Sequence, residues 1–485
     1  MKRRTAMEKA SPHVLIFPFP LHGHINSMLI LADLLCLAGI HVTFLNTDHT
    51  HHRLLRSNPD LLVDRPGLRF RSISDGLPLD QPRPIDRITD LFVSLRSATK
   101  PLLRAMLAGS GGGLGSDDPV TCVVADGLLS FAIDVADEVG IPIFIFRTAS
   151  PCSFWTFFCG PALAAGGEIP FEEDDMDRLI IGVPGMEAFL RRRDLPSLFR
   201  VKELSDLNLQ FILTEAQDAT RASCVILNTF EDLDGPILSH IRAHCPTTYA
   251  IGPLDALLKC RLTESNDFTP TSISLRTEDR TCLTWLNSQP DKSVLYISFG
   301  SAAVATQEQL LEFWHGVVNS QTRFLWVMRP DVVDRMGQIP AELREATDER
   351  GRLVGWAPQV DVLAHSAVGG FLTHCGWNST LESVSAGVPM ICWPFFVDQQ
   401  TNSRYVEEVW KVGLDMKDRC DRRTVEMMIR ELMEGKREEL VKSTARFADL
   451  AKRSVSQGGS SYMSFEKLVE NIRSMCQRAH PDGGK

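Results

Sequence analysis

A junction between an expected strand and an expected helix carries the polar groups best suited to bind an anion. The run HCGWNSTLES begins with His374 and places Asn378 and Ser379 near the expected helix start. Free backbone N–H groups and the positive end of the helix dipole attract phosphate oxygens there. We therefore predict a diphosphate site that needs no metal ion, with Gly376 allowing the backbone to approach the ligand closely.

A carboxylate follows one helical turn later. Glu382 would lie on the same face as Asn378 and Ser379. It is poorly placed for a phosphate but well placed to accept hydrogen bonds from a diol such as a ribose. The alternative is structural, because Ser379 and Glu382 also fit a capping box that would begin the helix at this serine.

Two short polar segments flank this junction. Before it, WAPQ places Trp356 after an expected strand, where the indole could stack on a base or belong to the core. After it, Asp398 and Gln399 follow another expected strand, where they could reach sugar hydroxyls or form an ordinary polar loop. Together these residues indicate a site for a sugar nucleotide.

A possible general base lies in the first half of the chain, in PFPLHGHIN. His24 stands where a helix is expected to begin, which favours a neutral, basic imidazole; His22 is the weaker candidate. Asp126 ends the apolar run VVAD, where an acid must be satisfied or functional. It is either a helix N-cap or the partner that orients His24 and stabilises its protonated form.

Apolar runs alternate with helical patterns along both halves of the chain, which indicates parallel sheets covered on both faces. We predict an α/β fold of two tandem Rossmann-like, doubly wound domains that face each other across a cleft, with ligands at the carboxyl ends of the strands. The expected divisions are an N-terminal domain at 1–252, a linker at 253–280, a second domain at 281–460 and a C-terminal helix that returns towards the first domain at 461–485.

The composition limits the class of protein. The net charge of −10 over 485 residues gives no basic field for nucleic acid. The 12 cysteines are scattered, which is typical of reduced thiols. The N-terminal run HVLIFPFPL is broken by two prolines and is interpreted as a buried strand, and no apolar run reaches transmembrane length. A monomeric cytoplasmic enzyme is expected, with no stable membrane insertion.

The stretch from Trp356 to Gln399 resembles the signature box of plant secondary-product glycosyltransferases, the family 1 enzymes that use uridine-diphosphate sugars. PFPLHGHINSM and SVLYISFGS extend the similarity towards the whole chain. The resemblance implies the GT-B architecture, with an acceptor-binding domain at 1–252 that carries the catalytic base and a donor-binding domain at 281–460. It also implies a role for each matching residue. The catalytic pair would be His24 and Asp126; the nucleoside contacts Trp356, Ala357, Gln359 and Glu382; the diphosphate contacts His374, Asn378, Ser379 and Ser301; and the sugar contacts Trp377, Asp398, Gln399 and Thr148.

Two positions depart from the family pattern. His22 stands where many relatives have glutamine, and Ser27 where many have proline. The first change could alter which histidine titrates or add an acceptor contact. Neither change removes the expected pair of His24 and Asp126.

The predicted reaction is an inverting transfer of glucose from UDP-glucose, without metal or cofactor, to a hydroxyl or carboxyl of a lipophilic plant metabolite. The overall resemblance implies terpenoid, iridoid or phenolic acceptors. The aromatic run from Phe154 to Phe158 either lines a pocket for an apolar, flat or bulky ligand or belongs to the core. A nicotinamide-dependent dehydrogenase is disfavoured by the missing glycine fingerprint. A sugar-nucleotide epimerase or hydrolase, or a UDP-sugar-binding protein without activity, remains an alternative.

Overall fold

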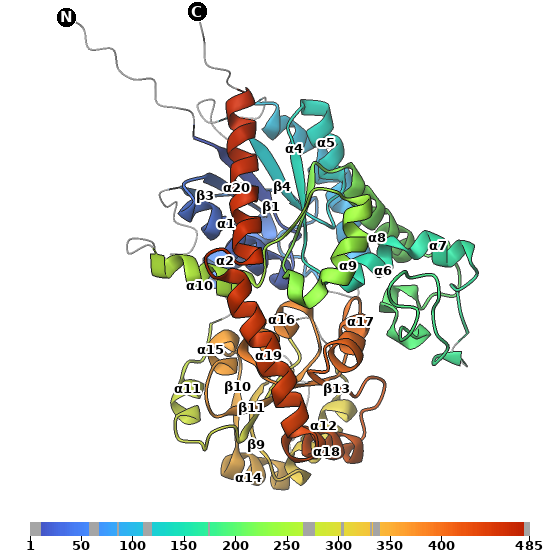
Figure 1. Cartoon of the computed structure of the whole chain (residues 1–485), viewed down its shortest axis with the longest axis vertical. Coiled ribbons are helices and arrows are strands. Elements are labelled where there is room, and N and C mark those ends of the chain that lie inside the picture. The colour runs from blue at the N-terminus through green and yellow to red at the C-terminus, as the bar shows by residue number, and fades with distance from the viewer. Residues whose placement is uncertain are drawn as a thin grey trace, which may run out of the picture.

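The computed structural model describes residues 11–57, 67–84, 87–109, 119–172, 175–264, 277–301, 305–329, 332 and 340–479. These residues form two lobes, each with a parallel sheet between layers of helices (Figure 1). This arrangement confirms the prediction of two tandem doubly wound α/β units. The stretch between the lobes that was expected to be a linker lies partly outside the described residues, at 265–276.

The first lobe is built on a seven-stranded sheet with the order β3-β2-β1-β4-β5-β6-β7. All pairings between its described strands are parallel, so the carboxyl ends of β1, β4 and β5 lie at one edge. The strands are β1 (His13–Phe17), β2 (His41–Thr47), β3 (Leu68–Ile73), β4 (Cys122–Asp126), β5 (Ile143–Arg147), β6 (Cys224–Leu227) and β7 (Thr248–Ala250).

The helices of this lobe cover both faces of the sheet. Every residue of β1, β4 and β5 is buried, as expected for parallel strands covered on both sides. Local signals set the helix ends: Ser150 caps α6 by accepting from the Ser153 N–H, and Gly140 ends α5 in the left-handed conformation. The helices are α1 (His22–Leu37), α2 (Asp48–Ser57), α3 (Ile88–Ser94), α4 (Lys100–Leu107), α5 (Phe131–Val139), α6 (Pro151–Phe158), α7 (Gly160–Ala165), α8 (Leu207–Asp218), α9 (Glu231–His244) and α10 (Leu254–Glu264).

The second lobe repeats the plan with a six-stranded parallel sheet of order β10-β9-β8-β11-β12-β13. Its strands are β8 (Val294–Ser298), β9 (Arg323–Val327), β10 (Gly351–Val354), β11 (Val368–Thr373), β12 (Met390–Cys392) and β13 (Gly413–Asp415). Its helices are α11 (Thr281–Leu286), α12 (Gln307–Asn319), α14 (Ala341–Arg350), α15 (Gln359–Leu363), α16 (Trp377–Ala386), α17 (Gln399–Arg404), α18 (Arg422–Arg430) and α19 (Arg437–Val455).

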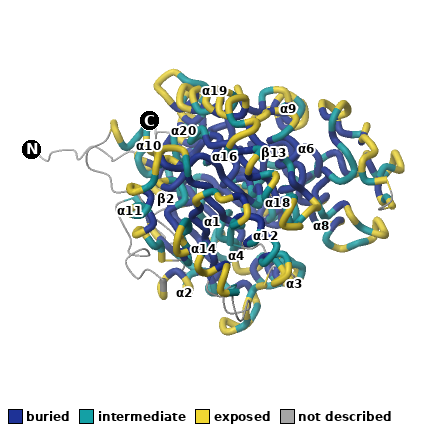
Figure 2. Tube along the Cα trace, turned by 90° about the horizontal axis from the view of Figure 1, so that it is seen from below, coloured by how far each residue is buried: buried dark blue, intermediate teal, exposed yellow. Residues whose placement is uncertain are grey.

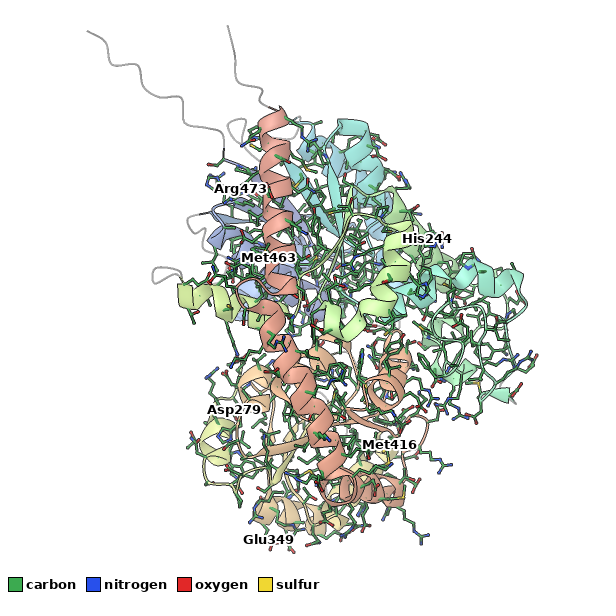
Figure 3. All side chains as sticks on the ribbon, viewed as in Figure 1. His244, Asp279, Glu349, Met416, Met463 and Arg473 are labelled. Carbon is green, nitrogen blue, oxygen red and sulfur yellow. The ribbon has the colours of Figure 1, made fainter. Side chains whose placement is uncertain are left out.

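The last helix, α20 (Ser460–Ala479), leaves the second lobe and runs along the first. Figure 3 shows its Met463 and Arg473 beside the first lobe, while Glu349 marks the far end of the second. Phe465 and Leu468 of α20 are buried in the same apolar cluster as residues of β1 and α1. Arg473 also donates to the Ala38 carbonyl, 2.6 Å away, so α20 ties the chain end to the first lobe.

Buried residues occupy the centre of both lobes, and exposed residues lie on the outer helices (Figure 2). The largest apolar cluster includes side chains from both lobes, among them Phe230 from the first and Trp377 from the second. The lobes therefore share a packed interface beside the cavity described below. None of the helices in the described part of the chain combines the length and apolar character needed to cross a membrane.

Candidate active site between the lobes

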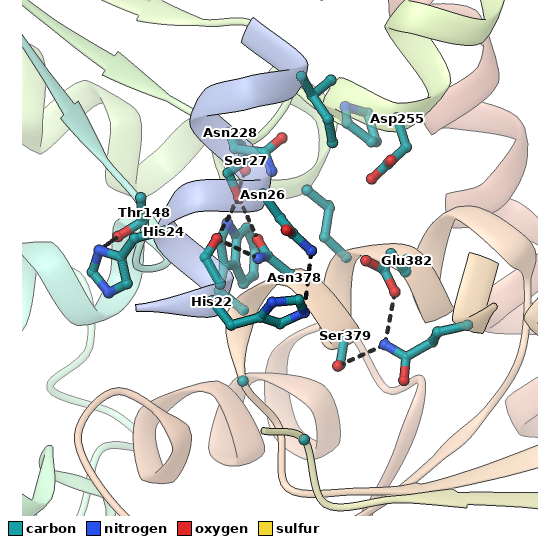
Figure 4. Close-up of a pocket in the computed structure, with 18 of the residues that line it drawn as sticks. His22, His24, Asn26, Ser27, Thr148, Asn228, Asp255, Asn378, Ser379 and Glu382 are labelled. Atoms are coloured by element: carbon teal, nitrogen blue, oxygen red, sulfur yellow. Dashed lines mark hydrogen bonds between the residues drawn. The ribbon is translucent and has the colours of Figure 1, made fainter. Parts of the chain in front are cut away.

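A cavity of ≈ 1740 Å³ lies between the two lobes, at the carboxyl ends of both sheets. Every residue predicted to act in the site lines it, from both lobes. Figure 4 shows His24 and Thr148 on one side, Ser379 and Glu382 on the other, and Asn378 between them. The two folds therefore bring together residues that are far apart in the sequence.

His24 and Asp126 form a hydrogen-bonded pair at the first lobe's edge of the cavity. Nδ1 of His24 lies 2.7 Å from Oδ2 of Asp126, and the aspartate side chain is fully buried. The other carboxylate oxygen accepts from the Leu128 N–H at 3.0 Å. Since α5 begins at Phe131 with Ser130 as its N-cap residue, the alternative of Asp126 as the helix cap is wrong.

Thr148 supports the same imidazole from the neighbouring strand end. Its Oγ1 lies 2.8 Å from Nδ1 of His24 (Figure 4). With Nδ1 engaged by Asp126 and Thr148, Nε2 is the ring nitrogen left to take a proton from a bound substrate. Asp398 of the second lobe adds a carboxylate near this ring, and its pKa is raised to about 6 by burial, opposed by its contact with Asn402 and by the nearby charge of His24.

The start of α16 differs from its prediction. The helix begins at Trp377, and Gly376 is the N-cap residue, with no side-chain cap. The expected capping box of Ser379 and Glu382 is therefore wrong, because both residues already lie inside the helix. Their side chains instead face Gln359, whose Nε2 donates to Ser379 Oγ at 2.8 Å and to Glu382 Oε2 at 2.7 Å.

His374 lies just before this helix start and is held neutral. Burial lowers the pKa of its imidazole to about 4, with a smaller contribution from Arg329. A neutral ring offers one N–H donor and no positive charge. Gly376 is required beside it, since a Cβ there would lie 2.5 Å from Nε2 of His374. His374 therefore adds no positive charge beside the free N–H groups at the start of α16.

Asn378 joins the lobes in addition to lining the cavity. Its Nδ2 donates to the Gly23 carbonyl at 3.0 Å, and its Oδ1 accepts from Ser27 Oγ at 2.9 Å. Ser27 is one of the departures from the family pattern, so this bond uses the hydroxyl that proline lacks. No local pattern predicts this bond, because the partners are 351 positions apart.

The remaining predicted residues lie in the cavity in different ways. Trp356 is half-buried and meets the His22 ring edge-on, with centroids 5.4 Å apart, while Ala357 is buried next to it. Gln399 accepts from the Phe395 N–H with Oε1, 2.8 Å away, and so shapes the turn before α17. The Ser301 carbonyl accepts from Arg329.

Trp377 lies differently from the predicted sugar contact. Its indole is buried and donates to the Asn228 carbonyl of the first lobe at 2.8 Å. The indole N–H is therefore used in the interface between the lobes.

Sequence reasoning missed Arg147 and Asp255, which also line the cavity. Arg147 ends the run IFIFR, and a charged residue after an apolar strand is the signal that identified Asp126. Asp255 stands in the first turn of α10, inside the segment expected to be a linker. No pattern in that segment indicated that it would face Glu382.

A cavity between two facing parallel sheets is typical of the two-domain GT-B glycosyltransferases. Similarity to known proteins identifies the family within that class. Residues 268–445 match the family described as UDP-glucoronosyl and UDP-glucosyl transferase. The chain is 53% identical over 472 residues to 7-deoxyloganetic acid glucosyltransferase of Catharanthus roseus, covering 96% of this chain and 98% of that protein. It is 40% identical over 476 residues to UDP-glycosyltransferase 85A2 of Arabidopsis thaliana, covering 95% and 97%.

The structure agrees with the sequence comparisons. Os79 from O. sativa in complex with UDP matches with a TM-score of 0.80 at 28% identity, over 95% of this chain and 100% of that one. The chain therefore belongs to the plant UDP-dependent glycosyltransferase family. The predictions of a GT-B fold and of a UDP-glucosyltransferase are confirmed.

Glu382 provides a stability test of the site. Burial, followed by the nearby Asp255 carboxylate, raises the pKa of Glu382 from 4.5 to about 8. The folded state therefore holds this proton more tightly than the unfolded state, and stability falls as pH rises from about 4.5 through 8. We expect Glu382→Gln to unfold in urea like the wild type at pH 4.5 but to be more stable at pH 9, by on the order of 1–2 kcal/mol. Equal stabilities at pH 9 would contradict the raised pKa.

Proposed function

We propose that this UDP-glucosyltransferase transfers glucose with inversion to a hydroxyl of a small lipophilic metabolite of the iridoid or phenolic type, giving a β-glucoside. The observation that carries the proposal is the pair of His24 and Asp126, which lies across one cavity from the start of α16. The similarity to 7-deoxyloganetic acid glucosyltransferase supports an iridoid acceptor.

In the proposed reaction, Nε2 of His24 takes the proton of the acceptor hydroxyl. The hydroxyl oxygen then bonds to the anomeric carbon of the α-linked glucose, on the face opposite the diphosphate. The bond from that carbon to the diphosphate oxygen breaks, and UDP leaves with the electron pair. Asp126 stabilises the imidazolium that forms, and Asp398 contributes from the second lobe.

The donor roles follow from the geometry of the second lobe. The N–H groups at the start of α16, with Asn378, Ser379, His374 and Ser301, would hold the diphosphate without a metal ion. Glu382 would accept from the ribose hydroxyls, positioned by its bond with Gln359. The uracil would be contacted by Trp356, Ala357 and Gln359. The glucose would be contacted by Asp398, Gln399, Thr148 and the backbone of Trp377.

The segments of the chain would then have different functions. Residues 1–252 would bind the acceptor and supply the base, 253–280 would link the lobes, 281–460 would bind the donor, and 461–485 would return to the first lobe. We propose that the enzyme acts as a monomer in the cytoplasm.

The test is an assay of the purified chain with UDP-glucose, with and without acceptor, in the presence of EDTA. We expect UDP release that matches β-glucoside formation and depends on the acceptor. Free glucose without an acceptor would indicate a hydrolase, and a new UDP-sugar would indicate an epimerase. Binding of UDP without turnover across a broad acceptor panel would indicate a binding protein.

A further inference from the structure

The guanidinium of Arg147 is buried at the acceptor side of the cavity, and none of the acidic side chains that the structure describes forms an ion pair with it. Arg147 ends β5 and is only 5% exposed, and its side chain lines the cavity with Gly127 and Phe154. Its Nη1 donates to the Gly127 carbonyl, and its guanidinium carbon lies 4.3 Å from the centroid of the Phe154 ring. The aromatic face supports the positive charge from one side.

The absence of a side chain at Gly127 leaves room for the side chain of Arg147. A Cβ on Gly127 would lie 2.2 Å from Cδ of Arg147, so any residue other than glycine would displace the guanidinium. Gly127 directly follows Asp126, the partner of His24. The Arg147 side chain therefore occupies the space beside Gly127, where any other residue would place a Cβ.

The carboxylates nearest to Arg147 are already engaged. Asp126 accepts from His24 and from the Leu128 N–H. Glu215 accepts from the N–H of Ser130 at 2.7 Å and from its hydroxyl at 2.8 Å. Among the described residues, no carboxylate oxygen lies within 4.0 Å of the Arg147 guanidinium.

The charge is nevertheless retained. Burial lowers the pKa of Arg147 to about 10, opposed by the more distant charges of Glu215 and Asp126, so the side chain stays protonated at neutral pH. Within the described part of the chain, Gly127 is the one hydrogen-bond acceptor of the guanidinium. A buried cation with unused N–H groups is unfavourable unless an anion pairs with it.

The guanidinium lines the same cavity as His24 and Asp126, the proposed catalytic pair. Arg147 precedes Thr148, whose hydroxyl contacts His24, and consecutive Cα atoms are about 3.8 Å apart. The strands β4 and β5 are paired, with Asp126 opposite Phe146. A small molecule could therefore contact both His24 and the guanidinium.

We propose that Arg147 binds a carboxylate of the acceptor, so that the enzyme prefers hydroxy acids whose hydroxyl reaches His24. A guanidinium pairs with a carboxylate through two parallel hydrogen bonds, which fixes the orientation of the ligand. Apolar side chains of the first lobe would enclose the hydrocarbon part; these include Phe154, Phe157, Leu198 and Phe211. This inference rests on the proposed function and names the acceptor class and the group that selects it.

The test compares a hydroxy acid with its methyl ester, which keeps the hydroxyl and removes the charge. The first pair is 7-deoxyloganetic acid and its methyl ester; a second pair is a hydroxybenzoic acid and its ester. We expect the wild type to favour one of these acids over its ester by about 10- to 100-fold in kcat/KM, mainly through KM. Arg147→Met should remove this preference, and Arg147→Lys should keep part of it.

Arg96→Met is the matched control. Arg96 also lies near Glu215, at 3.8 Å from Oε1, but its side chain is half-exposed and does not line the cavity. This substitution should leave the acid-to-ester ratio unchanged. Retained turnover of the ester by Arg147→Met would show that the variant is folded.

Three results would overturn the inference. The wild type could prefer neither acid over its ester, or Arg147→Met could keep the wild-type ratio of acid to ester turnover. In the third, Arg147→Met would lose activity only when UDP-glucuronate is the donor. The last result would place the carboxylate on the sugar. In each of these cases, glucose transfer to neutral phenols would leave the proposed function standing, whereas absence of transfer to every acceptor would refute that function separately.

Discussion

Replacing His24 with alanine is expected to lower kcat for glucose transfer by about 10²–10⁴, because a positioned general base contributes a factor of this size. Nδ1 of the wild-type ring is held by Asp126 at 2.7 Å, which leaves Nε2 for the acceptor proton. The measurement is the initial rate of β-glucoside formation at saturating UDP-glucose and acceptor. The Kd for UDP, measured by calorimetry, should stay within a few-fold of the wild type, since the proposed nucleotide contacts come from the second lobe.

Two further variants separate a base from a structural histidine. Asp126→Asn should also lower kcat strongly, because an amide neither fixes the same tautomer nor stabilises the imidazolium. His22→Ala removes the edge contact with Trp356 and should raise the KM for UDP-glucose more than it lowers kcat. A His24→Ala enzyme with normal turnover would show that His24 is not the base. A His22→Ala enzyme that loses kcat as severely would show that His22 also acts in the chemical step.

The fold could be predicted because its signals are local. Strands such as β1 and β5 are continuous apolar runs, and this pattern arises when both faces of a parallel sheet are covered. The predicted ends were less accurate: the run HVLIFPFPL was interpreted as a strand, but the strand ends at Phe17. Apolar character continues past that end, since Phe19 is buried too, so hydrophobicity alone could not locate it.

The start of α16 shows where a local signal misleads. Ser379 and Glu382 have the spacing of a capping box, yet the helix begins at Trp377. Gln359, 20 positions from Ser379, binds both side chains instead. A tertiary partner thus uses the groups that a local motif would have used, and only the fold reveals that partner.

The contacts between the lobes could not be predicted from one sequence. Asn378 and Ser27 are ordinary polar residues in their own segments, and their bond joins positions 351 apart. The same holds for Asp194 of the first lobe and Lys417 of the second, which are 223 positions apart. No periodicity or spacing relates residues so distant in the chain.

These last two residues form the centre of a buried charge cluster. Nζ of Lys417 lies 2.5 Å from Asp194 and 2.7 Å from Asp415, and all three side chains are at most 5% exposed. Although burial alone would raise the pKa of Asp194, Lys417 and Arg191 hold that pKa below its ordinary value. The cluster therefore connects the lobes through charges that depend on one another.

Lys417→Met is expected to lower the free energy of unfolding by about 3–5 kcal/mol, because it leaves two buried carboxylates without their shared cation. Methionine has a similar length, so the loss reflects charge more than packing. The measurement is urea unfolding at pH 7. The difference in unfolding free energy between the variant and the wild type should shrink at acid pH. The folded-state pKa of Asp194 is depressed, so protonation of Asp194 at low pH removes the contribution of its pair with Lys417 from the wild type as well.

Arg193 and Asp418 provide a matched comparison, since they join the same two segments at 3.0 Å but are more exposed, at 27% and 44%. Arg193→Met should cost at most about 1 kcal/mol, as exposed ion pairs do. Adding Asp194→Asn to Lys417→Met should recover part of the lost stability, because it removes one of the two buried carboxylates that have lost Lys417. Equal losses in the free energy of unfolding for Lys417→Met and Arg193→Met would show that the buried cluster stabilises the contact between the lobes no more than the exposed pair does.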